Sequence, residues 1–203
     1  MIGQRQYAAG PYQRFPGLNY AHSRPFRNWQ SSHLQTLIGG WLQSDPPSLE
    51  LATLALHELE LRHDDLNASM RFAEAELEPV PWLIEAGERV RRVFTPEILD
   101  TQKEGRLGGS VYVILRGGYS AENGFYGAYV GSTKRPPEKR AVEHRKGVRA
   151  GRGLQRYGIE PLWSLFGFVN PAPVKRERMM EWETRLHEAL APVVPKVTGD
   201  VAF

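Results

Sequence analysis

The sequence predicts an α/β fold of the α+β type, in which the C-terminal half holds a small three-stranded antiparallel sheet flanked by helices. Two β-branched and aromatic runs, 110–115 and 126–131, lie on either side of a loop with several turn-forming residues, which favours an antiparallel hairpin. A third apolar run at 162–169 predicts the remaining strand. The expected order is β-β-α, an irregular basic stretch, then β-α.

The two helices of this half have recognisable ends. The first is expected from 136 to about 146, because it opens with two prolines and a glutamate, which suit the first turn and its positive end, and is followed by a glycine. The second is expected from 175 to 191, where a proline closes it. Both helices therefore flank the predicted sheet.

Composition divides the chain into three segments. Residues 1–27 are rich in Gly, Pro, Gln, Arg and Tyr without helical or strand period, and are expected to form an irregular leader. Residues 28–104 form an accessory N-terminal region of uncertain fold. A glycine-rich break at 105–109 opens the compact module of residues 105–203.

Four weaker patterns mark the accessory region. Residues 33–38 indicate a short helix ended by the glycine pair that follows, while 51–61 alternates well enough to predict a strand. Residues 64–67 are expected to form a turn, and 80–98 a helix with a linker.

Composition also excludes several classes of protein. Hydrophobic residues make up 41% and charged residues 24% of the chain, and no apolar run reaches the roughly 18 residues of a membrane span. Residues 1–17 hold no apolar stretch that could form the core of a secretory signal, so a cytoplasmic location is expected. The absence of cysteine excludes disulfides and thiolate metal sites, so any metal ion must bind oxygen or imidazole.

Positive charge is concentrated although the net charge is only +3. In the segment 134–156, lysine and arginine far outnumber the two glutamates, Glu138 and Glu143. Such a segment is either a solvated basic face or a surface for nucleic acid, and a neighbouring site is needed to decide between them.

Four motifs occur in order along the C-terminal module. Val111-Tyr112-Val113 and Tyr129-Val130-Gly131 lie on the two hairpin strands, and Ser132-Thr133-Lys134 follows directly. Arg140 and His144 are one helical turn apart, and Glu183 is followed by Leu186 and Pro192. Over residues 108–200 this pattern resembles the GIY-YIG endonucleases, which implies their fold and the hydrolysis of DNA phosphodiester bonds with one divalent metal ion.

The resemblance implies a role for each residue. Tyr112 activates or orients the attacking water, although an unperturbed phenol has a pKa of about 10 and needs nearby cations to favour the phenolate. Tyr129 lines the groove, Arg140 holds the scissile phosphate through its fork of donors, and His144 is a proton acceptor or a hydrogen-bond partner of Tyr112. Glu183 binds the Mg²⁺ or Mn²⁺ ion. The structural alternatives are packed tyrosines, a solvated arginine and an idle histidine.

Helical geometry distinguishes Glu183 from its neighbour Glu181. On a helix of ~100° per residue, the apolar side chains between 179 and 190 gather on one face, which Glu183 borders, whereas Glu181 faces water. Glu183 is therefore the expected metal ligand.

Substrate contacts are expected from basic and polar residues near these motifs: Lys134, Ser132, Arg145, Lys146 and Arg149. The sequence departs from the resemblance at two places. Ser132 stands where some family members have a lysine, for which Lys134 is a substitute, and Pro195 stands where some have an asparagine, which puts activity in question. The long loop also makes Tyr119 and Tyr126 candidates to contact DNA.

The expected partner is DNA; no membrane is expected, and a homodimer is plausible because a double-strand cut needs two active sites. A catalytically inactive nucleic-acid-binding module of the same fold is the alternative function. Residues 22–62 weakly resemble α/β-hydrolases that carry an HLQT segment, here His33 to Thr36, but the Gly-x-Ser-x-Gly pentapeptide that exposes their nucleophile is absent. An esterase-like role for the first hundred residues is therefore only a minor alternative.

Overall fold

A mixed sheet organises the C-terminal half of the chain. In the computed structural model, which describes residues 7–8, 10, 12, 14–102 and 106–199, its strands follow the order β3-β1-β2-β5, and β4 pairs with β1. The strands are β1 (Leu107–Arg116), β2 (Gly127–Thr133), β3 (Gly158–Pro161), β4 (Ala172–Pro173) and β5 (Val197–Gly199). The helices are α1 (Ser31–Gln43), α2 (Leu49–Glu60), α3 (Leu66–Glu74), α4 (Leu83–Val93), α5 (Pro96–Gln102), the 3-10 turn η1 (Ala121–Asn123), α6 (Pro137–Arg145), α7 (Leu154–Tyr157), α8 (Trp163–Phe166) and α9 (Arg176–Leu190).

The predicted hairpin is confirmed. Strands β1 and β2 pair antiparallel, with Tyr112 opposite Gly131 and Ile114 opposite Tyr129. Because side chains alternate along a strand and cross-strand partners share a face, Tyr112 and Tyr129 point to the same side of the sheet.

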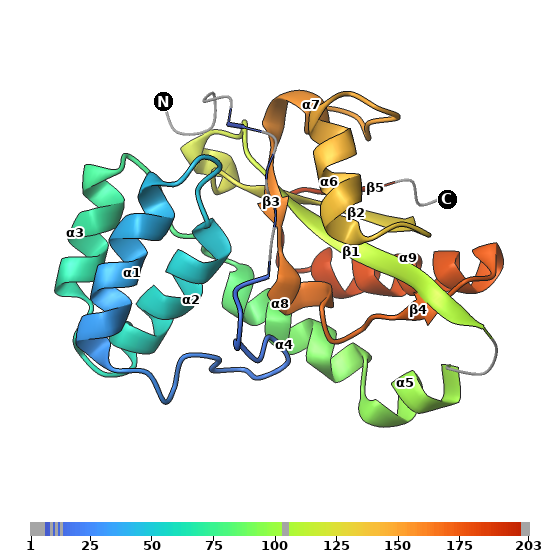
Figure 1. Ribbon diagram of the computed structural model, residues 1–203, viewed down its shortest axis with the longest axis horizontal. Helices are drawn as coiled ribbons and strands as arrows, with labels where there is room; N and C mark the ends of the chain where they lie inside the picture. The colour runs from blue at the N-terminus through green and yellow to red at the C-terminus, as the bar shows by residue number, and fades with distance from the viewer. Residues whose placement is uncertain (1–6, 9, 11, 13, 103–105, 200–203) are drawn as a thin grey trace.

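Two helices cover opposite faces of the sheet. Helix α6 lies over the face that carries Tyr112, whereas α9 lies behind the sheet in Figure 1. A Cβ atom added to Gly109, on the other face of β1, would come within 2.9 Å of Met179 Sδ on α9. The helices predicted at 136–146 and 175–191 are thereby confirmed as α6 and α9.

The third strand was predicted in the wrong place. The apolar run 162–169 contains the one-turn helix α8, and the strand β3 lies just before it. A short apolar run does not distinguish a strand from a buried helical turn, and here every residue of α8 is buried. The sheet also has five strands in the described residues rather than three, because β4 and β5 add short segments at β1 and β2.

Helices α1 to α4 form most of the N-terminal half, to the left and below in Figure 1. The strand predicted at 51–61 is wrong: this segment is α2, in which all residues except His57 and Glu60 are buried. A helix buried nearly all round shows no amphipathic period, and its leucine, alanine and glutamate residues favour helix. The turn predicted at 64–67 lies earlier, at 61–63, and α3 begins at Leu66.

The remaining N-terminal predictions hold in part. Helix α1 continues through Gly39-Gly40, because burial of Trp41 and Leu42 outweighs a glycine cost of about 1 kcal/mol per residue. The segment 80–98 holds α4 and the start of α5. Described residues of the leader 1–27 contain no helix or strand, yet Tyr12, Tyr20 and Phe26 are buried. This part of the chain is irregular but packed.

Two buried carboxylates join the halves. Glu160 on β3 accepts a hydrogen bond from the Glu50 N–H at the start of α2, with 2.7 Å between the atoms. In return, the Glu50 side chain accepts one from the Ser164 N–H in α8, at 2.6 Å. Each carboxylate therefore satisfies backbone donors at the N-terminus of a helix in the other half. Among the described residues, no helix is long and apolar enough to cross a bilayer.

Candidate functional site

Two tyrosines and a histidine meet on the α6 face of the sheet. The Tyr112 hydroxyl oxygen lies 2.8 Å from Nε2 of His144. The Tyr129 ring centroid lies 6.3 Å from that of Tyr112 and 5.4 Å from that of His144. Strand alternation aims both phenols at α6, and His144 is on the buried side of that helix. The structure thus brings together three of the predicted residues.

Glycine is required opposite Tyr112. A Cβ atom at Gly131 would lie 2.6 Å from the Tyr112 hydroxyl oxygen and 3.0 Å from a ring carbon of Tyr129. Both rings therefore extend across the space that a side chain at position 131 would fill.

His144 is neutral at physiological pH. Burial, the largest cause, and the positive charge of Arg140 together lower its pKa to about 4, against a smaller opposing effect of Glu143. Its second ring nitrogen, Nδ1, accepts a hydrogen bond from the Gly151 N–H at 3.0 Å. Both ring nitrogens consequently have defined partners.

Arg140 lies beside this cluster and holds a loop. Its guanidinium donates to the carbonyls of Val148, at 3.1 Å, and Arg149, at 2.6 Å, and to Glu143 at 3.1 Å. Burial lowers the pKa of Arg140, but the charge and hydrogen bond of Tyr112, together with Glu143, outweigh burial and raise it overall. The guanidinium is therefore close enough to Tyr112 to stabilise negative charge on the phenol oxygen.

Glu183 approaches from a different side. Its exposed fraction is 6%, whereas the Glu181 side chain is 60% exposed, so the helical argument that separated the two is confirmed. However, Glu183 belongs to α9, on the sheet face opposite α6. Ser132 pairs with Val111, so it also points away from the tyrosine face. These two residues are the predicted site residues that do not share the face of the cluster.

The predicted substrate-binding residues divide into two groups. Lys134, Lys146 and Arg149 are exposed. Arg145 instead has a structural role, since it donates to the carbonyls of Gln155, at 2.5 Å, and of Tyr7 in the leader.

The long hairpin loop does not present both its tyrosines to a groove. Tyr126 is buried, and its hydroxyl donates to the Glu78 carbonyl at 3.0 Å, so it packs against the N-terminal half. The guanidinium of Arg116 lies over the ring of Tyr119, with its Cζ atom 5.5 Å from the ring centroid. The expectation that Tyr126 contacts DNA is wrong.

Glu183 offers a carboxylate oxygen of the kind that a divalent ion accepts, but the residue is only 6% exposed. The described residues contain no group of three or more His, Cys, Asp or Glu side chains that could hold a metal ion. A single carboxylate that leaves most positions to water is compatible with Mg²⁺, which dehydrates reluctantly. Glu183 is the carboxylate that the resemblance assigns to the ion.

A loop completes the cluster; the sequence predicted that Lys146 and Arg149 within it bind substrate but did not predict its contact with the tyrosines and His144. Residues 146–153 cross its outer side, and a Cβ atom at Gly151 would lie 2.4 Å from the Tyr129 ring. The clue available in the sequence was the glycine spacing within the basic segment, which was interpreted as an irregular stretch with a basic face that is either solvated or binds nucleic acid.

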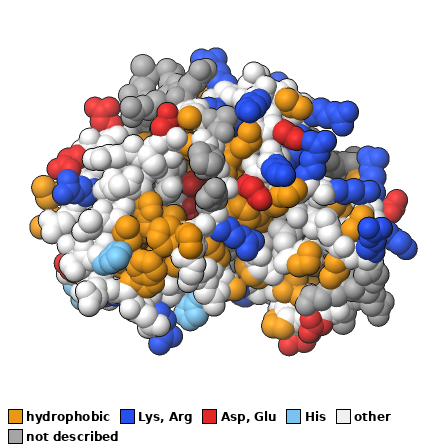
Figure 2. All heavy atoms as spheres, in the orientation of Figure 1, with side chains coloured by type: hydrophobic (Ala, Val, Ile, Leu, Met, Phe, Trp, Pro, Cys, Tyr) orange, Lys and Arg blue, Asp and Glu red, His pale blue; other side chains and the backbone are white. Residues whose placement is uncertain are grey.

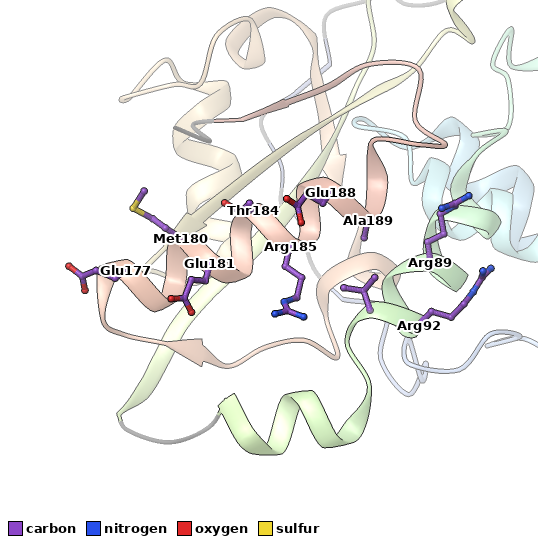
Figure 3. A pocket seen from close by; sticks show the side chains of 10 residues that line it. Arg89, Arg92, Glu177, Met180, Glu181, Thr184, Arg185, Glu188 and Ala189 are labelled. Carbon is purple, nitrogen blue, oxygen red and sulfur yellow. The ribbon is translucent and has the colours of Figure 1, made fainter. Parts of the chain in front are cut away.

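A large hollow of the described surface lies elsewhere. A groove of about 940 Å³ runs between α4 and α9, and Figure 3 shows Arg185 reaching into it while Arg89 and Arg92 stand on the α4 side. Its lining includes Glu177, Glu181 and Glu188, so its charges are mixed. This groove is on the outer side of α9, away from the tyrosine face, and is not the candidate site.

The site is therefore defined by its geometry alone. Comparison of this chain with known proteins finds no matching family model, no similar curated protein and no similar solved structure.

Proposed function

We propose that this protein is a metal-dependent endonuclease that hydrolyses DNA phosphodiester bonds on the α6 face of the sheet. The observation that carries the proposal is the Tyr112 hydroxyl 2.8 Å from His144, with Arg140 beside it. A phenol oxygen between an imidazole and a guanidinium is suited to hold negative charge and to take a proton from water. The motif resemblance to GIY-YIG endonucleases supports the same reading.

In this mechanism Tyr112 loses its phenol proton to solvent, and the resulting phenolate accepts a proton from the attacking water, which it gives back to solvent after the reaction. The water oxygen forms a bond to phosphorus, the opposite phosphorus–oxygen bond breaks, and the leaving oxygen takes a proton from solvent. Tyr129 orients the water, and Arg140 offsets the charge that develops on the phosphate. The motif resemblance would assign a metal ion to Glu183, but because Glu183 lies on the opposite face of the sheet, no step at the phosphate on the α6 face is assigned to that ion.

Exposed basic residues on this side of the molecule support binding of a polyanion. Figure 2 shows lysine and arginine side chains gathered on the right of the visible face, around α6. Lys134, Lys139, Lys146 and Arg149 are exposed there. Such residues bind phosphates in a salt-dependent manner that is independent of sequence.

A specific observation favours the second candidate, a nucleic-acid-binding module without cleavage. Tyr112, Tyr129 and His144 are only 2%, 3% and 1% exposed, and the loop at 146–153 occupies donors of Arg140. Cleavage therefore requires this loop to move when DNA binds, whereas binding alone does not.

A cleavage assay separates the two candidates. Purified protein is incubated with plasmid, duplex, branched and single-stranded DNA in Mg²⁺ and Mn²⁺. We expect nicking or cutting that Tyr112→Phe reduces at least about 100-fold while DNA retention stays unchanged. A similar loss in Glu183→Ala would show that Glu183, although it lies behind the sheet, takes part through a bound metal ion. Glu181→Ala, on the exposed side of the same helix, is the matched control and should cleave like the original protein. Binding without cleavage of any substrate would support the second candidate, and unchanged cleavage by Glu183→Ala would remove the metal role of Glu183.

A further inference from the structure

The hydrogen bond from Gly151 determines where the His144 ring carries its proton. A backbone N–H can only donate, so Nδ1 of His144, 3.0 Å from the Gly151 nitrogen, must offer a lone pair. A neutral imidazole carries one ring proton, which then resides on Nε2. Nε2 is the atom that lies 2.8 Å from the Tyr112 hydroxyl. The histidine therefore donates to the tyrosine and does not accept from it.

We infer that Gly151 is a positioning residue: its N–H holds His144 in the Nε2–H tautomer, so that the phenol oxygen of Tyr112, and not the imidazole, receives the proton of the attacking water. The catalytic part of this inference rests on the proposed function. The tautomer itself does not, because it follows from the hydrogen bonds alone. Of the two roles open to His144 in the sequence, partner of Tyr112 and proton acceptor, the geometry points to the first.

Only glycine lets the backbone come close enough at this position. A Cβ atom at Gly151 would lie 2.4 Å from Cε2 and 2.6 Å from Cζ of Tyr129, so the ring lies directly against the backbone. The neighbouring Gly147 and Gly153 have φ angles of +79° and +80°, which residues with a side chain rarely adopt. These glycines let the loop backbone pack directly against the Tyr129 ring.

The loop is fastened at a second point by the same helix. Arg140, one turn before His144 on α6, binds the carbonyls of Val148 and Arg149. Arg140 thus donates hydrogen bonds to two carbonyl groups of the loop, while the loop donates a hydrogen bond from the Gly151 N–H to His144. Displacement of residues 148–149 by substrate would release Arg140 for a phosphate, while the Gly151 N–H stays on His144 and keeps its tautomer.

The tautomer is measured directly by nitrogen-15 NMR of the histidine rings in the full chain at pH 7, without DNA. We expect His144 to show a single Nε2–H tautomer, and Gly151→Ala to show a mixture or the Nδ1–H form. Val148→Ala, a truncation of an exposed side chain in the same loop, should match the original protein. A His144 ring that is protonated on Nδ1 in the original protein would overturn the inference, even if the protein cleaves DNA.

Cleavage rates of His144 variants test the chemical consequence. Glutamine places an amide N–H near the position of Nε2 but cannot accept a proton, whereas alanine provides neither. We expect His144→Gln to cleave within about 10-fold of the original protein and His144→Ala to lose about 100-fold or more. Equal loss in both variants, with both folded, would show that the ring acts as a proton acceptor and would refute the inference. Failure of the original protein to cleave any DNA would instead refute the proposed function and leave the NMR result as the test of the tautomer.

Discussion

The two buried glutamates that join the halves should make stability depend on pH in a direction opposite to that of most carboxylates. Burial raises the pKa of Glu50 to about 7, against an ordinary value of 4.5, although hydrogen bonds from Ser164 and Trp163 and the charge of Arg14 oppose the rise. Burial and the charge of Glu50 also raise the pKa of Glu160. A raised folded-state pKa means that the native protein favours the protonated form more than the unfolded chain does. This contribution is therefore complete below about pH 4.5 and is lost as the pH rises to 7.

The magnitude follows from the size of the shift. A difference of about 2.5 pKa units at 1.36 kcal/mol per unit corresponds to a loss of roughly 3 kcal/mol between pH 4.5 and 8. The Glu50→Gln variant keeps an acceptor for the Ser164 N–H but carries no charge, so it should not show this loss. The free energy of unfolding of the variant minus that of the original protein should rise by roughly 3 kcal/mol over the same range.

Urea unfolding at several pH values, monitored by tryptophan fluorescence, measures this difference. The free energy of the original protein is subtracted from that of the variant because other groups titrate in the same pH range. His144, for example, has a lowered pKa and destabilises the protein as the pH falls. Glu60→Gln, whose side chain is 52% exposed on the same helix, is the control and should follow the original protein at every pH. If Glu50→Gln and the original protein differ by a constant amount from pH 4.5 to 8, the burial argument is refuted.

Two further predictions concern the site and its surface. Gly131→Ala should push the Tyr112 ring out of place, abolish cleavage and destabilise the protein by about 1–3 kcal/mol, as measured by thermal unfolding. The control is Gly40→Ala on helix α1, where the added carbon has nothing within 4 Å, and this variant should be as stable as the original protein or more stable. Equal behaviour of the two variants would contradict the steric argument. Replacing both Lys146 and Arg149 by alanine should lower the slope of log affinity against log salt by about 1.8 for duplex DNA, measured by fluorescence anisotropy, and an unchanged slope would place the DNA elsewhere.

The sequence could predict elements whose pattern is local. The β1–β2 hairpin and the helices α6 and α9 have strong periodicity and clear ends, and their predicted bounds agree with the structure within a few residues. The side chains Tyr112, Tyr129 and His144 could be placed together because strand alternation and helical spacing fix their directions.

What the sequence could not predict depends on contacts between distant residues. Helix α2 was mistaken for a strand because its burial is nearly complete, and burial by other helices leaves no trace in a short pattern. The mutual capping by Glu50 and Glu160 joins positions 110 residues apart. The closeness of Gly151 to His144 results from the path of a loop, for which composition gives no rule. The face occupied by α9, which separates Glu183 from the tyrosines, follows from packing in the same way.

The contacts of α4 and its neighbours bear on what a fragment of this protein could do. Phe94 packs against Trp182 of α9 with ring centroids 5.7 Å apart, and the Trp82 indole donates to the Tyr126 carbonyl at 3.2 Å. Deleting the first hundred residues would leave the fully buried Trp182 without its neighbour and uncover one side of the hairpin loop. The N-terminal helices therefore cover part of the same core as the sheet, so the chemistry of the tyrosines should be measured in the intact chain.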